Sequence, residues 1–275
     1  MDMDIIELVI KIGSMALIRK QDNDIDYNIL SRLSAELKPG IALVSSGAVE
    51  IGRLDYIKRA GRELQGDRDA VKTDYAAQGQ AILMSHYRQF VRPEYSVRQV
   101  LVEHIHFNDP AKREHIRQML VRSAGQGAVP IINYNDTVSA EENRKLELSA
   151  LRKSTDAVVE GVDNDETAAV VANLVGAKTL VILMSADGIY RDAGDPSTLV
   201  ESVCGADADE IEAEIRVLQA SCVGASRAGA QGAGAKLEYI IPAARRGTTV
   251  IIGNPRYRVA DLLSGNVPCT RIAMG

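Results

Sequence analysis

Lys11 is the first residue whose type and position suit phosphate chemistry. It lies near the end of a short run rich in Val and Ile, and Gly13 and Ser14 follow it. Because glycine has no side chain, backbone N–H groups beside it can approach an anion closely, and the lysine adds a positive charge. The segment therefore predicts a phosphate-binding turn at the end of a strand. The alternative is a surface lysine beside an ordinary turn.

A second lysine, Lys236, follows a tract rich in Gly and Ala that spans residues 224–235 and includes Gly232 and Gly234. The tract is not a P-loop, because that motif has a lysine directly after its last glycine and then Ser or Thr. Here an alanine separates Gly234 from Lys236, and Leu237 comes next. A glycine-rich segment that delivers one lysine can still hold a phosphate, so we expect Lys236 to contact an anion.

Short polar side chains and a small-residue turn form a second group, at the expected ends of other strands. Such groups suit the amino, hydroxyl and carboxylate groups of a small polar ligand. The members are Ser46, Gly47, Ala48, Asn133, Asp136 and Asn164. The alternative for the turn is a tight connection between a strand and a helix. The alternative for Asn164 is that it, or Asp163, caps the helix that follows.

The elements that must position these residues follow an alternating pattern. Short apolar runs rich in Val and Ile alternate with segments of helical period, which predicts an α/β fold with a mostly parallel sheet covered on both faces. The expected strands are 8–12, 41–44, 98–102, 129–132, 179–183 and 249–252. Ligands of such sheets bind beyond the carboxyl ends of the strands, where the polar residues collect. We expect one compact unit over residues 1–275.

The expected helices lie between these strands. Apolar residues recur at helical spacing in segments 29–37 and 211–218, and residues 165–177 predict a helix that is apolar on nearly all sides and buried against the sheet. The charged stretches 53–73 and 140–162 break the alternation. We expect both to be surface excursions.

Composition and spacing exclude several classes of protein. Lys and Arg total 32 against 37 Asp and Glu, and aromatic residues make up only 4%, which disfavours nucleic-acid binding. The cysteines and histidines lack the spacing of a metal site, and the serines lack a Gly-x-Ser-x-Gly nucleophile motif. Apolar stretches fall short of the roughly 20 residues that span a membrane. We expect a cytoplasmic protein with no membrane partner.

Taken in chain order, these segments resemble the amino acid kinase family, and within it the enzymes that phosphorylate the side-chain carboxylate of glutamate. The resemblance rests on segments 11–14, 45–48, 76–80, 129–133, 135–136, 163–165 and the glycine-rich tract that ends at Lys236. It spans nearly the whole chain and concerns the kinase domain, so a C-terminal RNA-binding-like domain is not expected here.

The resemblance implies a three-layer α/β/α sandwich with a mostly parallel central sheet. It implies ATP and Mg²⁺, and transfer of the γ-phosphoryl group to the γ-carboxylate of glutamate or a related small acid, as in the first step of proline biosynthesis. Residues 1–160 would form the acceptor half and residues 161–275 the nucleotide half of a single domain. It also implies a homo-oligomer.

The resemblance further implies roles for individual residues. Lys11 and Lys236 would neutralise charge on the moving phosphoryl group, and Asp165 would hold both lysines. Acceptor binding is implied for Ser46, Gly47, Ala48, Asn133, Asp136 and Asn164. Nucleotide binding is implied for Lys11, Gly13, Ser14, Ser185, Asp187, Tyr190, Gly232, Gly234 and Lys236. Backbone N–H groups would come from Gly13, Gly47 and Ala48, and Mg²⁺ would be held by phosphates and waters rather than by protein ligands.

Three segments depart from the family pattern. Residues 184–187 are Met-Ser-Ala-Asp where the family usually has Thr or Ser followed by Asp, and Pro242 predicts a kinked or shortened helix after Lys236. Twenty-six residues separate Asp136 from Asp163, more than glutamate-phosphorylating members typically have. The alternatives are therefore a family member that acts on another small carboxylate or phosphate, and a non-catalytic homologue that binds a nucleotide or an anion.

Overall fold

A computed structural model describes residues 5–19, 21–139, 141–153, 158–161, 163–192, 194–221 and 232–275, without the side chains of 141–143 and 232–233. Its strands are β1 (Leu8–Ile12), β2 (Ile18–Arg19), β3 (Asp24–Ile25), β4 (Ile41–Ser45), β5 (Ser96–Val102), β6 (Ala128–Tyr134), β7 (Thr179–Leu183), β8 (Ser202–Gly205), β9 (Thr249–Gly253) and β10 (Cys269–Met274). Its α-helices are α1 (Tyr27–Glu36), α2 (Ala48–Ala60), α3 (Arg68–Phe90), α4 (His104–Asn108), α5 (Pro110–Gly125), α6 (Glu141–Leu151), α7 (Asn164–Val175), α8 (Ala208–Ser221), α9 (Gly232–Ala244) and α10 (Val259–Ser264).

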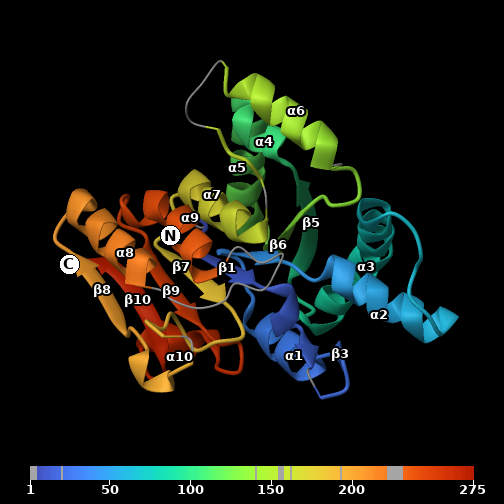
Figure 1. The fold of residues 1–275 in the computed structure, drawn as a ribbon, viewed down its shortest axis with the longest axis horizontal. Coiled ribbons are helices and arrows are strands. Elements are labelled where there is room, and N and C mark those ends of the chain that lie inside the picture. Colours follow the sequence, from blue (N-terminus) through green and yellow to red (C-terminus); the bar gives the residue numbers. More distant parts are fainter. Residues whose placement is uncertain are drawn as a thin grey trace.

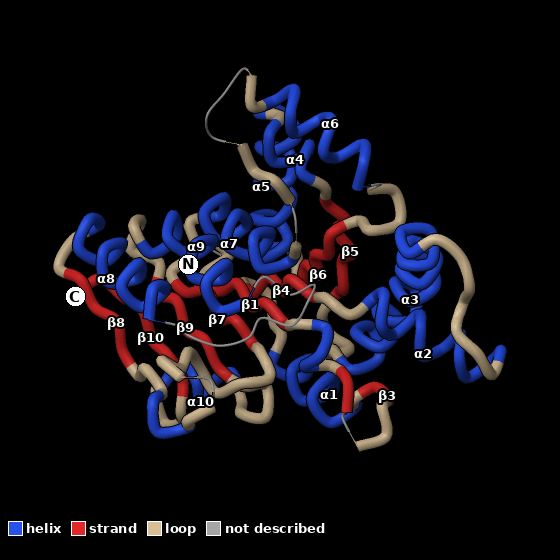
Figure 2. The backbone as a smooth tube through the Cα atoms, in the orientation of Figure 1, coloured by secondary structure: helices blue, strands red, loops and turns tan. Residues whose placement is uncertain are grey.

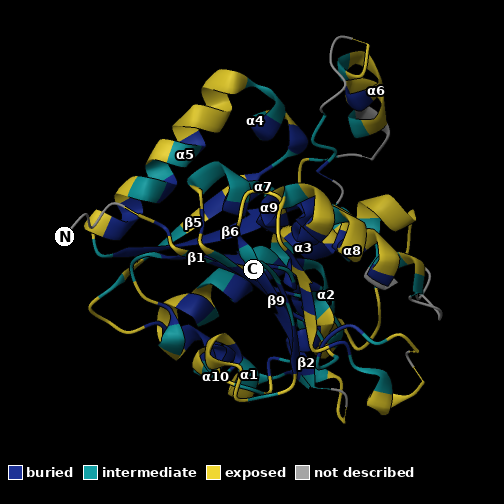
Figure 3. Ribbon diagram, turned by 90° about the vertical axis from the view of Figure 1, so that its left-hand side faces the viewer, coloured by how far each residue is buried: buried dark blue, intermediate teal, exposed yellow. Residues whose placement is uncertain are grey.

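One eight-stranded sheet forms the centre of the molecule, in the order β5-β6-β4-β1-β7-β9-β10-β8 (Figures 1 and 2). β10 runs antiparallel to β9, and the other neighbouring strands are parallel. Helices α5, α7, α8 and α9 cover one face, here called the α7 face, and α1, α3 and α10 cover the other, the α1 face (Figure 3). The predicted three-layer α/β/α sandwich with a mostly parallel sheet is therefore confirmed.

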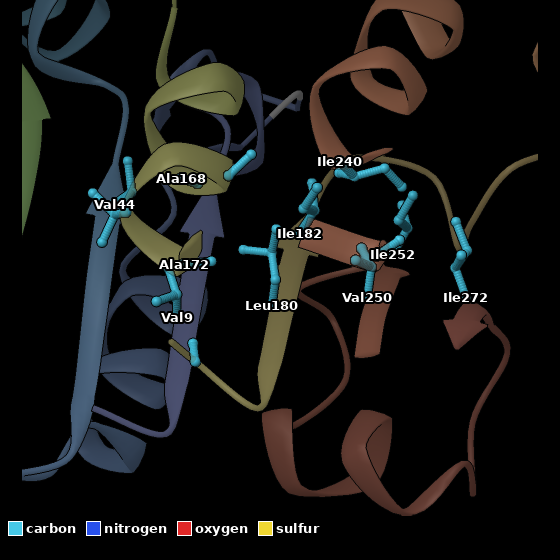
Figure 4. Packing of buried hydrophobic residues seen from close by; sticks show 14 of the residues in the cluster. Val9, Val44, Ala168, Ala172, Leu180, Ile182, Ile240, Val250, Ile252 and Ile272 are labelled. Atoms are coloured by element: carbon cyan, nitrogen blue, oxygen red, sulfur yellow. The ribbon is translucent and has the colours of Figure 1, made fainter. Parts of the chain in front are cut away.

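Alternation along the central strands divides their side chains between two apolar cores. Val9 of β1 and Val44 of β4 pack on the α7 face against Ala168 and Ala172 of α7, where small alanines let the helix lie close to the sheet (Figure 4). Ile10 belongs to the core of the α1 face. Because both faces are covered, these strands are continuously apolar, which is why their sequences are so distinctive.

All six expected strands are present, and the structure adds β8 and β10 at one edge and the short hairpin β2–β3. The segments of β8 and β10 do not show a continuous apolar run, because Ser202 and Cys204 face solvent and Arg271 is half-buried. β8 is the edge strand and buries only alternate residues, and β10 beside it ends in two half-buried residues, so neither segment forms a continuous apolar run.

The two charged stretches turn out to be helical. Residues 53–60 continue α2 and residues 68–73 begin α3. Within the stretch 140–162, α6 spans residues 141–151 and projects from the body beside α4 and α5 (Figure 1). Helix α9 passes through Pro242 and ends two residues later, at Ala244. Within the described residues, none of the helices is both long and apolar enough to cross a membrane.

Candidate active site

Three charged side chains meet at the carboxyl end of β1. The Lys11 ammonium lies 2.7 Å from Oδ1 of Asp165, and the Lys236 ammonium donates to Oδ2 of the same carboxylate. The side chains of Lys11 and Asp165 are only 7% and 6% exposed. The arrangement matches the expected pairing of both lysines with Asp165, although 154 and 71 positions of sequence separate Asp165 from Lys11 and Lys236.

Local structure explains how these residues meet. Lys11 lies two residues after Val9 on β1, so both side chains point to the same face of the sheet. That is the α7 face, where helix α7 begins. Asp163 caps that helix, because its carboxylate accepts hydrogen bonds from the N–H groups of Asp165 (2.8 Å) and Glu166 (3.0 Å). The cap fixes the first turn of α7 and hence the direction of the Asp165 side chain.

The charges of this cluster set its protonation. Burial alone would raise the pKa of Asp165, but Lys11 and Lys236 outweigh burial and hold that pKa below its usual value. Burial lowers the pKa of Lys11, and Lys236 lowers it further, while Asp165 acts in the opposite direction. With both lysines protonated and Asp165 ionised, the three side chains together carry one net positive charge in a largely buried place.

Backbone geometry around the lysines corrects one expectation. The N–H of Gly13 donates to the carbonyl of Leu183 at 3.2 Å, so it joins β1 to β7 and is not offered to a ligand. A Cβ atom at Gly13 would lie 3.5 Å from the Lys11 ammonium, so the glycine instead keeps the space beside this charge open. Ser14 begins a short 3-10 turn directly after it.

The turn before α2 presents the N-terminus of a helix. Gly47 has φ of +114°, which favours glycine, and a Cβ atom there would lie 3.1 Å from Leu17. Ala48 is the first residue of α2, and among the described side chains none caps this end. The first N–H groups of a helix lack partners within the helix. Gly47 and Ala48 therefore lie at the N-terminus of α2, where backbone N–H groups can donate to a ligand.

A chain of amide and hydroxyl groups connects four elements on the acceptor side. The Asn164 amide donates to the Ser46 hydroxyl at 3.2 Å and to Oδ1 of Asn133 at 2.7 Å, and its oxygen accepts from the Tyr134 N–H. The Asn133 amide in turn donates to Oε1 of Gln80 on α3 at 2.7 Å. Of the two candidates for the cap of α7, Asp163 is confirmed, whereas the Asn164 side chain bonds residues outside the helix.

Asp136 completes this side through a residue that the sequence did not single out. Lys72 of α3 lies with its ammonium 2.7 Å from Oδ1 of Asp136. Asp136 also lines a small cavity together with Ala48, Ala76 and Gln80. The family motif at 76–80 pointed to this helix, and the spacing of residues 72, 76 and 80 at i, i+4 and i+8 is the signal that would have placed Lys72 on the same face.

The expected nucleotide residues lie after β7, next to Gly13. Oδ2 of Asp187 accepts a hydrogen bond from Arg256 at 2.6 Å, and its Oδ1 is buried without a hydrogen-bond partner in the described structure. The exposed Ser185 offers its carbonyl to Asn254 at 3.3 Å. Burial raises the pKa of Tyr190, and the charge of Asp187 raises it further. Two loops, after β7 and after β9, therefore share this region.

The glycine-rich tract is described only in part. Residues 222–231 lie outside the described residues. Gly232 and Gly234 fall in the first turn of α9, and Lys236 follows in the same helix. The carbonyl of Gly234 accepts from Gln219 of α8 at 2.8 Å. In the described residues, no group of three or more His, Cys, Asp or Glu side chains is placed to hold a metal ion.

The chain is similar to known proteins over nearly its whole length. The sequence model of the amino acid kinase family matches residues 7–254. A glutamate 5-kinase of Gloeobacter violaceus is 33% identical over 278 residues, which cover 98% of this chain and 69% of that protein. A glutamate 5-kinase of Herpetosiphon aurantiacus is 33% identical over 282 residues, with the same coverage.

Solved structures show the same fold at much lower identity. Carbamate kinase from Giardia lamblia bound to AMP-PNP has a TM-score of 0.59 at 16% identity and covers 98% of both chains. A second Giardia carbamate kinase structure has a TM-score of 0.57 at 16% identity, over 98% of this chain and 99% of the other. At such identities the likeness concerns the architecture alone.

Proposed function

The chain belongs to the amino acid kinase family, and on this premise we propose that it transfers the γ-phosphoryl group of ATP to the γ-carboxylate of L-glutamate. The observation that carries the proposal is the buried cluster of Lys11, Asp165 and Lys236, which has two positive charges and one negative charge. A buried excess charge is costly unless it is paired. An anionic group such as the phosphoryl group of ATP would supply the missing negative charge.

Both lysines act on charge in this mechanism. Phosphoryl transfer needs positioning and charge neutralisation more than covalent help, and a carboxylate is already a nucleophile without a general base. Lys11 of strand β1 contacts Oδ1 of Asp165, and Lys236 of helix α9 contacts Oδ2. Asp165 is an organising residue here, because its two oxygens are both engaged by lysines.

The acceptor amino acid binds on the neighbouring side in this proposal. Ser46, Asn133 and Asn164 form one hydrogen-bonded chain, and the N-terminus of α2 at Gly47 and Ala48 attracts negative charge. Asn164 belongs by sequence to the nucleotide half, yet it bonds Ser46 and Asn133 of the acceptor half. Helix α7 therefore joins the two halves, with Asn164 toward the acceptor and Asp165 toward the phosphoryl group.

ATP would lie over the loops after β7 and β9 and over the start of α9. Ser185, Asp187 and Tyr190 follow β7, and Gly13 and Ser14 follow the adjacent strand β1. When bound, Mg²⁺ would neutralise charge on the phosphates. The product would be an acyl phosphate, glutamyl 5-phosphate, as in the first step of proline biosynthesis.

The test is ADP release from Mg-ATP with hydroxylamine present to trap an acyl phosphate as a hydroxamate. The acceptors are L-glutamate, L-aspartate, N-acetyl-L-glutamate, carbamate, UMP and isopentenyl phosphate. We expect ADP release and hydroxamate with L-glutamate. Release with another acceptor in its place would overturn the glutamate assignment and keep the kinase, whereas ATP binding without release with any acceptor would favour a non-catalytic homologue.

Variants test the assigned roles. Lys236→Ala removes one of the two charges that stabilise the transferring group, and we expect kcat to fall by about 100- to 1,000-fold. Lys178→Ala is the control. Lys178 pairs with Glu7 at 2.6 Å at the amino-terminal ends of β7 and β1, whereas the lysine cluster lies at the carboxyl ends. Equal activity of the Lys236 variant and the control would show that Lys236 has no part in phosphoryl transfer.

A further inference from the structure

Lys72 and Asp136 form an ion pair at the mouth of the acceptor side. Their charged atoms are 2.7 Å apart, although 64 positions of sequence separate the residues. The side chain of Lys72 is 54% exposed and that of Asp136 is 20% exposed. An exposed pair of this kind adds little to stability, so its contribution to folding does not explain its position.

The surroundings of the pair point to a ligand. Lys72, Ala76 and Gln80 lie one above the other on one face of α3, and this face meets the end of β6. Gln80 bonds Asn133, Lys72 bonds Asp136, and Ala76 lies between Lys72 and Gln80 on the same helix face. Asp136, Ala76 and Gln80 line one small cavity, together with Ala48 at the N-terminus of α2.

We propose that Lys72 binds the α-carboxylate of the acceptor while Asp136 binds its α-ammonium group, so that the pair selects a free α-amino acid. The inference rests on the proposed function and adds a residue and a selection rule to it. An α-amino acid carries both charges on one carbon atom, and a lysine and a carboxylate at contact distance present the complementary two charges. The ligand exchanges one internal ion pair for two pairs with the protein, and neither side chain is left with an unpaired charge.

The pairing also rejects related compounds. Glutarate lacks the ammonium group and would place a second carboxylate beside Asp136, while 4-aminobutyrate lacks the α-carboxylate and would leave Lys72 without its ligand. Both keep the carboxylate that would be phosphorylated. Discrimination would thus arise from the charge left unpaired in each wrong complex, as well as from the contacts made in the right one.

The experiment compares Lys72→Met with the wild-type protein on L-glutamate and on 4-aminobutyrate. We expect the variant to lose about 10- to 100-fold in kcat/KM for L-glutamate, mainly through KM, because a charged hydrogen bond to the α-carboxylate is gone. The value for 4-aminobutyrate should change by less than about threefold, since this compound has no group for Lys72. If turnover of 4-aminobutyrate is below detection, its inhibition constant against L-glutamate gives the same comparison.

Lys58→Met is the matched control, because Lys58 is 55% exposed and pairs with Asp24 at 2.6 Å, away from the acceptor side. Lys72→Arg should recover most of the lost affinity for L-glutamate, which loss of folding would not allow. Equal losses on both compounds, or none on L-glutamate, would overturn the role of Lys72 alone. A wild-type protein that does not phosphorylate L-glutamate would overturn the proposed function itself and this inference with it.

Discussion

The acceptor side and the nucleotide side of this protein are built in different ways. On the acceptor side, Ser46, Asn133 and Asn164 are joined by direct hydrogen bonds, and Asn133 and Asn164 are buried. On the nucleotide side, Asp187 pairs with Arg256, whose side chain is 56% exposed. Buried polar networks fix geometry because an unpaired member is costly, whereas exposed pairs exchange readily with water. The acceptor side is therefore expected to tolerate change less than the nucleotide side.

The largest effect should come from the residue between the two sides, Asp165. Asp165→Asn removes the negative charge that pairs with both Lys11 and Lys236, so the two ammonium groups repel each other and lose their positions. We expect kcat to fall by about 1,000-fold, and the free energy of unfolding to fall by about 3–5 kcal/mol, as for other broken buried ion pairs. Steady-state kinetics and denaturant unfolding measure the two. Kinetics unchanged from wild type would remove Asp165 from the mechanism.

A second large effect is expected on stability, where alanine should be tolerated less at Gly79 on the acceptor side than at Gly234 on the nucleotide side. A Cβ atom at Gly79 would lie 1.8 Å from the carbonyl oxygen of Ala48, where α2 and α3 cross, so Gly79→Ala must move one helix. We expect a loss of about 2–3 kcal/mol in the free energy of unfolding. Among the described atoms, a Cβ atom at Gly234 on the nucleotide side meets only Gln219, at 3.8 Å, so Gly234→Ala should cost less than about 1 kcal/mol. Equal losses in urea unfolding would contradict this difference in packing.

The acceptor network itself should control one substrate only. Asn164→Ala breaks the bonds to Ser46 and Asn133 and leaves buried partners unpaired. We expect KM for L-glutamate to rise about 30-fold, with KM for ATP within about twofold of wild type. A comparable rise for both substrates would show that the two sides are not separate in function.

The pH dependence should report the charge of Lys11. Burial lowers its pKa below the ordinary value of 10.5. When the pH rises above that lowered pKa, the ammonium loses its proton, and we expect kcat to fall about tenfold per pH unit. Asp165 favours the charged form, so Asp165→Asn should move this alkaline limb to lower pH. A limb that stays in place, measured on the residual activity of the variant, would assign the titration to another group.

The smallest effect is expected from Arg256. Its bonds to Asp187 and to the Tyr257 hydroxyl are both 2.6 Å long but exposed. Arg256→Ala should raise KM for ATP by about two- to fivefold and leave KM for L-glutamate unchanged. If KM for ATP rises more in Arg256→Ala than KM for L-glutamate rises in Asn164→Ala, the nucleotide side tolerates change less than the acceptor side, contrary to our expectation.

Much of the fold could be predicted because the signal is local. The strands that carry Lys11 and Asn133 are continuous apolar runs, which only a sheet covered on both faces requires. The helix that begins near Asp165 was also predictable from its apolar composition. The edge strand β8 was not, because it buries only one face and its short sequence shows no comparable run.

Within the site, the sequence by itself determined which side chains stand at strand ends, and only the tertiary structure decided their partners. Asp163 and Asn164 are adjacent and both suit a helix cap, yet one caps α7 and the other bonds Ser46 across the sheet. Lys72 lies on a charged helix, and its own sequence neighbourhood does not mark it. The packing of α3 places it beside Asp136. Periodicity reports a residue's own element, whereas ion pairs between distant segments depend on strand order and helix packing, which no local pattern contains.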